Sequence, residues 1–108
     1  MDLISFLNEA KKRILAGKLD FIPRAKNITF LQLHGLTPLD VEDILLNITT
    51  NDFFSGPVPD ISIPSEEVWV FKKYIESEYV YIKIKLRQYR NSTLVDDLVC
   101  ISLHTDES

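Results

Sequence analysis

The segment from Glu78 to Gln88 is the most informative part of this sequence for the chemistry that its side chains could do. Aliphatic residues alternate along it with polar or aromatic ones, which is typical of a strand with one buried and one exposed face. Lysine and arginine neutralise phosphates, and tyrosine rings stack on nucleobases. The pattern therefore predicts a nucleic-acid-binding face made of Tyr79, Tyr81, Lys83, Lys85 and Arg87. A solvated outer face of an antiparallel sheet explains the same alternation, so the pattern alone leaves both interpretations open.

Other titratable side chains lie outside this segment. Lys72 and Lys73 are consecutive in the preceding apolar segment, so only one of them can share a face with the tyrosines, and spacing does not decide which. His104 ends the last apolar segment, and an imidazole can act as a general acid or base near neutral pH. His34 is predicted to stabilise a helix C-terminus. Cys100 is predicted to be a buried, inert thiol.

Length and composition exclude several classes of protein. The 108 residues support one domain, spanning 1–108. No apolar run approaches the roughly 20 residues of a membrane span, and the first residues lack the pattern of a secretory signal. With a single cysteine, no internal disulfide is expected, and the cytoplasm is the predicted compartment. Cysteine and histidine lack zinc spacing and the glycines stand alone, so neither a metal nor another cofactor is predicted.

The net charge of −4 hides a strong asymmetry. Residues 37–71 contain acidic side chains but no lysine or arginine, whereas residues 72–90 contain six basic and two acidic ones. A uniformly basic nucleic-acid-binding protein is therefore excluded, but a local basic face is not. The acidic segment cannot attract RNA, so RNA is expected to approach the opposite, lysine-rich surface.

Three helices are predicted in the first half of the chain. Apolar residues recur at helical spacing from Leu3 up to a stop at Gly17. A short extended piece, Leu19 to Ile22, precedes a second helix over Arg24 to Leu33. Thr37 and Asp40 have the spacing of an N-terminal cap of a third helix.

The second half is predicted to be a long ordered loop followed by β-structure. Residues 49–66 contain three closely spaced prolines, which cannot supply a central strand. The runs 67–76, 78–88 and 97–104 predict three strands, the first two joined by a tight hairpin. The fold class is then α+β, with N-terminal helices packed on a C-terminal three-stranded antiparallel sheet. Val80, Ile82, Ile84 and Leu86 should face the helices.

Several short motifs follow one another in a fixed order along nearly the whole chain. They are Arg24-Ala25, His34-Gly35-Leu36-Thr37, Asn51-Asp52-Phe53-Phe54, Gly56-Pro57, Val68-Trp69-Val70-Phe71, Val80-Tyr81-Ile82-Lys83 and Cys100-Ile101-Ser102-Leu103-His104. In this order the chain resembles the MqsR family of type II toxins, within the RelE/ParE-like superfamily, and looks closest to a branch common in Gram-positive bacteria. Better-known members carry lysine where this chain has Ser55, glutamine where it has Val70, and lysine where it has His104.

The resemblance implies a metal-independent messenger-RNA endoribonuclease that a cognate antitoxin inhibits. The predicted catalytic residues are then Tyr81, Lys83 and His104, and the predicted RNA-binding residues are Lys73, Lys85, Arg87 and Tyr79. Because a meander places the strand of His104 beside that of Tyr81, the three catalytic residues should lie together at one edge of the sheet, with Lys73 or Lys85 close by. The antitoxin should cover this surface or lock the loop over residues 52–64.

A second function stays open at this point. The same fold would also serve as a non-catalytic binding module that engages a protein partner or a nucleic acid. The acidic net charge and the residues at Ser55 and Val70 favour the module, whereas the tyrosine–lysine face and His104 favour the enzyme. Poisoning of another target, such as a topoisomerase, is known in the broader superfamily, and nothing in the sequence selects it.

Overall fold

Three helices form where local signals predict them. In the computed structural model, which describes residues 1–88 and 96–107, α1 spans Leu3–Leu15, α2 spans Ala25–His34 and α3 spans Pro38–Leu46. Thr37 and Asp40 form the predicted capping box at the start of α3, which satisfies N–H groups that have no partner within the helix. Gly35 ends α2 at a φ of 62°, a left-handed conformation that glycine adopts without steric cost.

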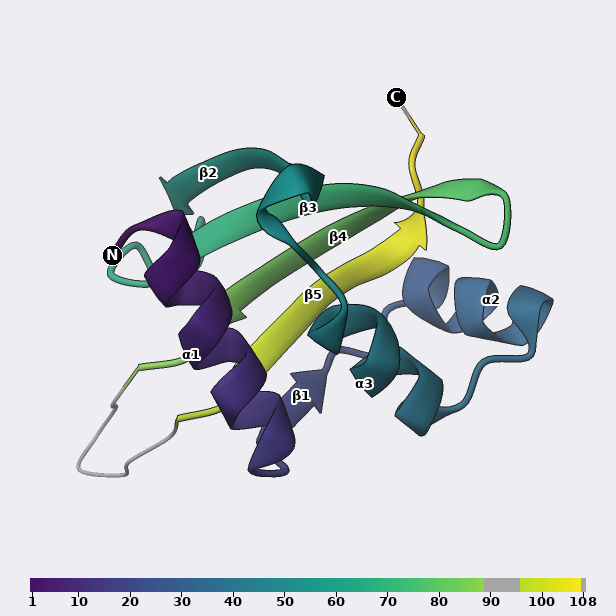
Figure 1. The fold of residues 1–108 in the computed structure, drawn as a ribbon, viewed down its shortest axis with the longest axis horizontal. Helices are drawn as coiled ribbons and strands as arrows, with labels where there is room; N and C mark the ends of the chain where they lie inside the picture. Colours follow the sequence, from purple (N-terminus) through teal and green to yellow (C-terminus); the bar gives the residue numbers. More distant parts are fainter. Residues whose placement is uncertain (89–95, 108) are drawn as a thin grey trace.

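The strands form one mixed sheet beside these helices. They are β1 (Leu19–Phe21), β2 (Phe53–Pro59), β3 (Glu67–Ile75), β4 (Glu78–Leu86) and β5 (Leu98–Thr105), with a 3₁₀ turn, η1 (Thr50–Asp52), before β2. Their order across the sheet is β1-β5-β4-β3-β2. β1 runs parallel to β5, and every other neighbouring pair is antiparallel. Figure 1 shows α1 and α3 on the same face of this sheet; we call the opposite face the outer face.

The predicted hairpin and the predicted buried face are both confirmed. Glu76 and Ser77 join β3 to β4 with φ angles of 50° and 71°, which is the two-residue turn that matches strand twist. Val80, Ile82 and Ile84 are at most 1% exposed and belong to the core formed with the helices. Leu86 packs partly buried against the same core. The alternation therefore places Tyr79, Tyr81, Lys83, Lys85 and Arg87 on the outer face.

The prediction of a three-stranded antiparallel sheet is wrong, because the sheet has five strands and is mixed. The sequence predicts only a short extended piece where β1 forms, since three residues carry no periodicity and the parallel partner β5 lies far along the chain. β2 lies within the segment predicted to be a loop. Its prolines are tolerated because β2 is at the edge of the sheet, and its pairing with β3 has register shifts. Gly56 lets the two backbones approach, since a Cβ there would lie 2.7 Å from the Val68 carbonyl oxygen.

Two further sequence expectations concern the β4–β5 connection and the membrane. The sequence predicts a longer turn over residues 89–96, between the second and third predicted strands, and this segment lies almost entirely outside the described residues. Within residues 1–88 and 96–107, no helix is long and apolar enough to cross a membrane.

A buried asparagine in α2 completes the edge of β5. β1 pairs with β5 only as far as Cys100, so the backbone groups beyond it need other partners. Asn27 is fully buried. Its amide nitrogen donates to the carbonyls of Ile22 and Ile101, and its side-chain oxygen accepts from the Leu103 N–H, all within 3.0 Å. One side chain thus fixes α2 against the end of β5.

Replacing Asn27 with alanine is expected to lower the free energy of unfolding by at least about 2 kcal/mol, because an unpaired buried polar group costs about 1–3 kcal/mol. Urea denaturation measures this loss. Thr29→Ala, at an exposed position of the same helix, is the matched control and should change stability by less than about 0.5 kcal/mol. Equal losses in both variants would contradict the role assigned to Asn27.

Candidate active site on the outer face of the sheet

Tyr81 and His104 are the centre of the candidate site. They are directly opposite each other on β4 and β5, and their rings stack with centroids 5.5 Å apart and planes 19° apart. His104 Nδ1 lies 2.9 Å from the Thr105 carbonyl oxygen. A carbonyl only accepts hydrogen bonds, so the proton of this bond belongs to Nδ1, and in the neutral ring Nε2 is then the acceptor. The geometry therefore leaves Nε2 suited to receive a proton.

Lys83 and Arg24 place two positive charges beside this pair. Lys83 is opposite Ser102 in the register of β4 and β5. Arg24, just before α2, donates from Nη1 to Ser102 Oγ at 3.0 Å and lies 3.5 Å from the Ile101 carbonyl oxygen. In the part of the chain that the structure describes, neither cation has a carboxylate within 4.0 Å. Asp60 interacts with Lys83 only at longer range, so two cations without a directly bound carboxylate near one hydroxyl form a site that favours an anion.

Arg24 was not predicted as a site residue. Its sequence neighbourhood shows only Pro23 and the start of a helix, and nothing in the spacing connects it to Ser102, which lies far along the chain. The parallel pairing of β1 with β5 brings the start of α2 to this place. The resemblance included Arg24 as part of a motif but gave it no role.

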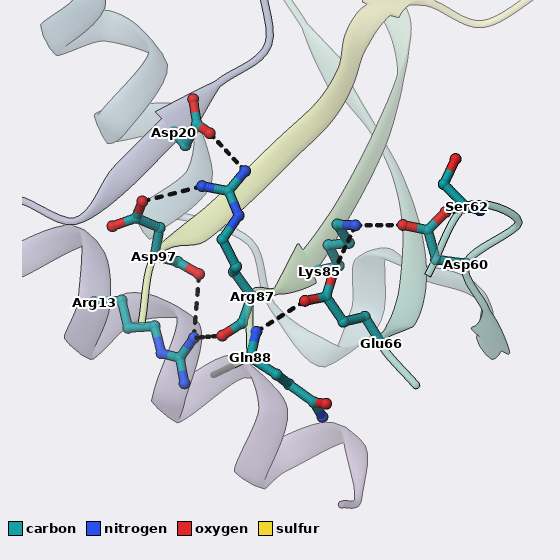
Figure 2. Close-up of polar contacts among 9 residues, drawn as sticks. All are labelled: Arg13, Asp20, Asp60, Ser62, Glu66, Lys85, Arg87, Gln88 and Asp97. Atoms are coloured by element: carbon teal, nitrogen blue, oxygen red, sulfur yellow. Dashed lines mark hydrogen bonds and ion pairs between the residues drawn. The ribbon is translucent and has the colours of Figure 1, made fainter. Parts of the chain in front are cut away.

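Lys85 is on the predicted face but is held in buried ion pairs. The residue is 7% exposed, its Nζ forms a close ion pair with Asp60, and it lies 2.8 Å from Glu66 Oε1 (Figure 2). Glu66 is 1% exposed, and its other oxygen accepts from the Gln88 N–H at 2.9 Å. The hydrogen bond from Lys85 is the main reason that the pKa of Asp60 is lowered from its ordinary value. These contacts make Lys85 part of the packed structure.

Arg87 is likewise occupied by acidic partners. Its guanidinium lies 2.7 Å from Asp20 and 3.2 Å from Asp97, as Figure 2 shows. Arg13 of α1 donates to the carbonyls of Arg87 and Asp97, both at 3.1 Å. Arg87 therefore joins the ends of β4, β1 and β5, and its charge is already compensated.

The structure also decides which lysine of β3 shares the face of Tyr81. Lys72 is directly opposite Tyr81, whereas Lys73 is opposite the buried Val80. Lys73 points to the helix face, where its Nζ lies 3.0 Å from the Asn47 carbonyl oxygen and 3.6 Å from Asp52. Lys72 is 8% exposed, lies 3.0 Å from Asp106 and has its Nζ 3.8 Å from the Phe54 ring centroid. Neither Lys73 nor Lys85 is therefore an open cation next to Tyr81.

Tyr79 extends the open part of the outer face toward the hairpin. It is 41% exposed, and Tyr74 opposite it is 73% exposed. Their ring centroids lie 4.9 Å apart. Two exposed rings one step beyond Tyr81 on the same face are suited to stack on bases.

Two of the three positions at which this chain departs from the family it resembles lie in one cross-strand row with Lys83. Ser55 is opposite Val70, Val70 is opposite Lys83, and Lys83 is opposite Ser102. At the β2 end of this row, the side chains are therefore the hydroxyl of Ser55 and the buried aliphatic group of Val70. Arg24 adds a cation at its other end through Ser102.

The two residues predicted to be structural do have structural surroundings. His34 is at the end of α2, with its ring nitrogens 3.3 Å from Glu76 and 3.2 Å from Glu78, so it fixes the helix to the hairpin. Cys100 is fully buried, and burial raises the pKa of its thiol to about 12. The neutral thiol is a poor nucleophile at physiological pH.

The fold and the site together define a small α+β domain with an aromatic and cationic site on the open face of its sheet. Within the described ranges, no three acidic, histidine or cysteine side chains are arranged to hold a metal ion. A scan against protein-family models and a search of curated proteins both found no match. We therefore infer the function from the geometry of this chain.

Proposed function

We propose that this chain is the toxin of a type II toxin–antitoxin system and that it cleaves messenger RNA at the outer-face site in the cytoplasm. The observation that carries the proposal is the grouping of a stacked tyrosine–histidine pair with two cations that have no carboxylate partner among the described residues. Acid–base groups next to an anion site are what phosphodiester cleavage requires. The four residues are Arg24, Tyr81, Lys83 and His104.

The reaction we assign to this site needs no group from outside the chain and the RNA. Nε2 of His104 removes the proton of a ribose 2′-hydroxyl, and the 2′-oxygen attacks the adjacent phosphorus. Lys83 and Arg24 stabilise the charge that builds on the phosphorus oxygens. Tyr81 donates its phenolic proton to the leaving 5′-oxygen, since a phenol O–H is a hydrogen-bond donor. The products are a 2′,3′-cyclic phosphate and a 5′-hydroxyl.

The cognate antitoxin is proposed to act by covering the outer face. Carboxylates of an inhibitory segment would pair with Arg24 and Lys83, which have no carboxylate within 4.0 Å among the described residues. The acidic segment 37–71 contributes α3 to the helix face of the sheet (Figure 1), but it also contributes Asp60 and Glu66, which pair with Lys85 on the outer face. Arg24 and Lys83 are therefore the groups expected to attract both RNA and an acidic inhibitor.

A non-catalytic binding module is the second candidate function, and a specific observation favours it. Lys72, Lys85 and Arg87 all lie within 3.2 Å of a carboxylate, so the outer face is less basic than the sequence predicts. A module would keep the stacking rings and the anion site but would not cleave. A cleavage assay distinguishes the two functions, because only the enzyme cuts the RNA that it binds.

The purified chain, free of antitoxin, is expected to cleave a 5′-labelled messenger RNA in the presence of EDTA and to leave 2′,3′-cyclic phosphate ends. A DNA of the same sequence should bind but remain intact, because it lacks the 2′-hydroxyl. Gel analysis of products before and after phosphatase treatment identifies the ends. Binding of both nucleic acids without cleavage of either would replace the proposal with the binding module.

A further inference from the structure

A groove opens next to His104 between α2 and the end of β5. It has a volume of about 280 Å³, near the lower end of small-molecule pockets. Its lining includes Ala25, Thr29, Phe30, Leu33 and His104. The walls are thus apolar, with hydroxyl and imidazole groups at intervals. A groove of this kind fits one planar heterocycle rather than a nucleic-acid duplex.

The groove and the anion site are continuous. His104 belongs to both, and Ala25 in the groove follows Arg24 directly in the chain. An RNA phosphate held by Arg24 and Lys83 would therefore place an adjacent nucleoside at the groove entrance. This step rests on the proposed function.

One ion pair connects the two sides of the groove. Lys26 of α2 lies 2.6 Å from Glu107, and their side chains are 58% and 62% exposed. Both residues line the groove. An ion pair this exposed contributes little to stability, because water screens it. It can open for a ligand at small cost.

We propose that this groove binds one unstacked nucleobase of the RNA, next to the phosphate that is cleaved. The base face would contact Phe30 and Leu33, and the hydroxyl of Thr29 would meet its polar edge. A base can enter only when it is out of a helical stack, so the substrate class is single-stranded RNA. The groove thereby positions the ribose 2′-hydroxyl toward His104.

The test is an NMR titration of the intact chain with nucleoside 3′-monophosphates and with inorganic phosphate. The nucleotides are expected to bind about tenfold more tightly, because one base contact is worth that or more. Thr29→Trp, which fills the groove, should reduce nucleotide binding to the level of inorganic phosphate. Gln32→Trp, at an exposed position of α2 outside the groove lining, is the matched control and should preserve the tenfold difference.

Two outcomes separate this inference from the proposed function. Lys83→Ala should weaken inorganic phosphate and nucleotides equally; absence of any phosphate binding to the wild type would overturn the anion site and with it the proposed function. Phosphate binding without a nucleotide preference would overturn the groove alone. Leu33→Ala, which removes an exposed apolar side chain, gives a second check if Thr29→Trp does not fold, and it should reduce the preference several-fold.

Discussion

Replacing Lys85 with methionine is expected to lower the free energy of unfolding by about 3–5 kcal/mol, the cost of removing one partner from a buried ion pair. The lysine is 7% exposed, and the Glu66 carboxylate beside it is 1% exposed. Methionine keeps the unbranched chain but removes the charge, so Glu66 and Asp60 lose their cation. Chemical denaturation followed by circular dichroism measures the loss.

Two further variants test the assignment of Lys85 to the structure. Lys83→Met, two residues along the same strand face, is the matched control and should change stability by less than about 1 kcal/mol, since that lysine has no carboxylate within 4.0 Å among the described residues. Adding Glu66→Gln to Lys85→Met should restore part of the stability, because the buried negative charge is then absent. If Lys85→Met is as stable as wild type but binds RNA poorly, the sequence-based role of Lys85 would be correct.

The loss of unfolding free energy in Lys85→Met should also depend on pH. The hydrogen bond from Lys85 is the main cause of the lowered pKa of Asp60. A carboxyl group whose pKa is lowered by folding contributes stability above its ordinary pKa of about 4, and this contribution is lost as pH falls through the folded pKa. The stability difference between wild type and Lys85→Met is therefore expected to narrow below about pH 4. A difference that stays constant to pH 2 would contradict the contribution of Asp60.

Local signals were sufficient for the helices and the hairpin, because their causes lie within a few residues. The capping box at Thr37 and the left-handed Gly35 are both visible in the sequence. β1 and β2 were not predictable in this way. β1 has three residues and a partner far along the chain, and β2 contains prolines that local rules assign to loops. Only the edge position of each strand makes these segments suitable for a sheet.

The site was predictable in the pairing of its central strands but not in its charges. The meander was enough to place the strand of His104 beside that of Tyr81, whereas alternation alone does not put His104 on the face of Tyr81. Alternation predicts the same exposed environment for Lys83 and Lys85. In the structure, Lys83 is open, whereas Lys85 is paired with Asp60 and Glu66 from a preceding loop. The spacing of residues within a strand does not predict which acidic side chains from distant segments will pair with its lysines.

A bulge in β5 is a second limit on reasoning from alternation. Cys100 and Ser102 have the same parity, so an unbroken strand would place them on one face. In the structure, Cys100 is opposite the core residue Ile84 and Ser102 is opposite Lys83. Ile101 is the extra residue between them, and such a bulge turns the following side chains to the other face. The bulge is therefore what brings Ser102 and His104 to the outer face.

Replacing His104 with alanine is expected to lower the rate of RNA cleavage by about 10²–10⁴-fold, the usual contribution of general acid–base catalysis. RNA affinity should fall little, since Arg24 and Lys83 still hold the phosphate. A general base acts only in its unprotonated form, so the rise of the wild-type rate with pH should depend on His104. This rise should be absent from His104→Ala, a result that a purely structural role would not produce.

The chain offers a matched control for this prediction, because its only other histidine is His34. That ring lies between Glu76 and Glu78 at the hairpin, so His34→Gln should leave the pH profile of cleavage intact. Tyr81→Phe keeps the ring that stacks on His104 but removes the proton donor, and it should therefore reduce the rate more than RNA affinity. Cleavage by His104→Ala at the wild-type rate would remove His104 from the base role and leave the ribonuclease needing another base. Both His104→Ala and Tyr81→Phe should cleave RNA slowly. If only His104→Ala also changes the dependence of the rate on pH, then His104 is the base and Tyr81 is the acid of the stacked pair.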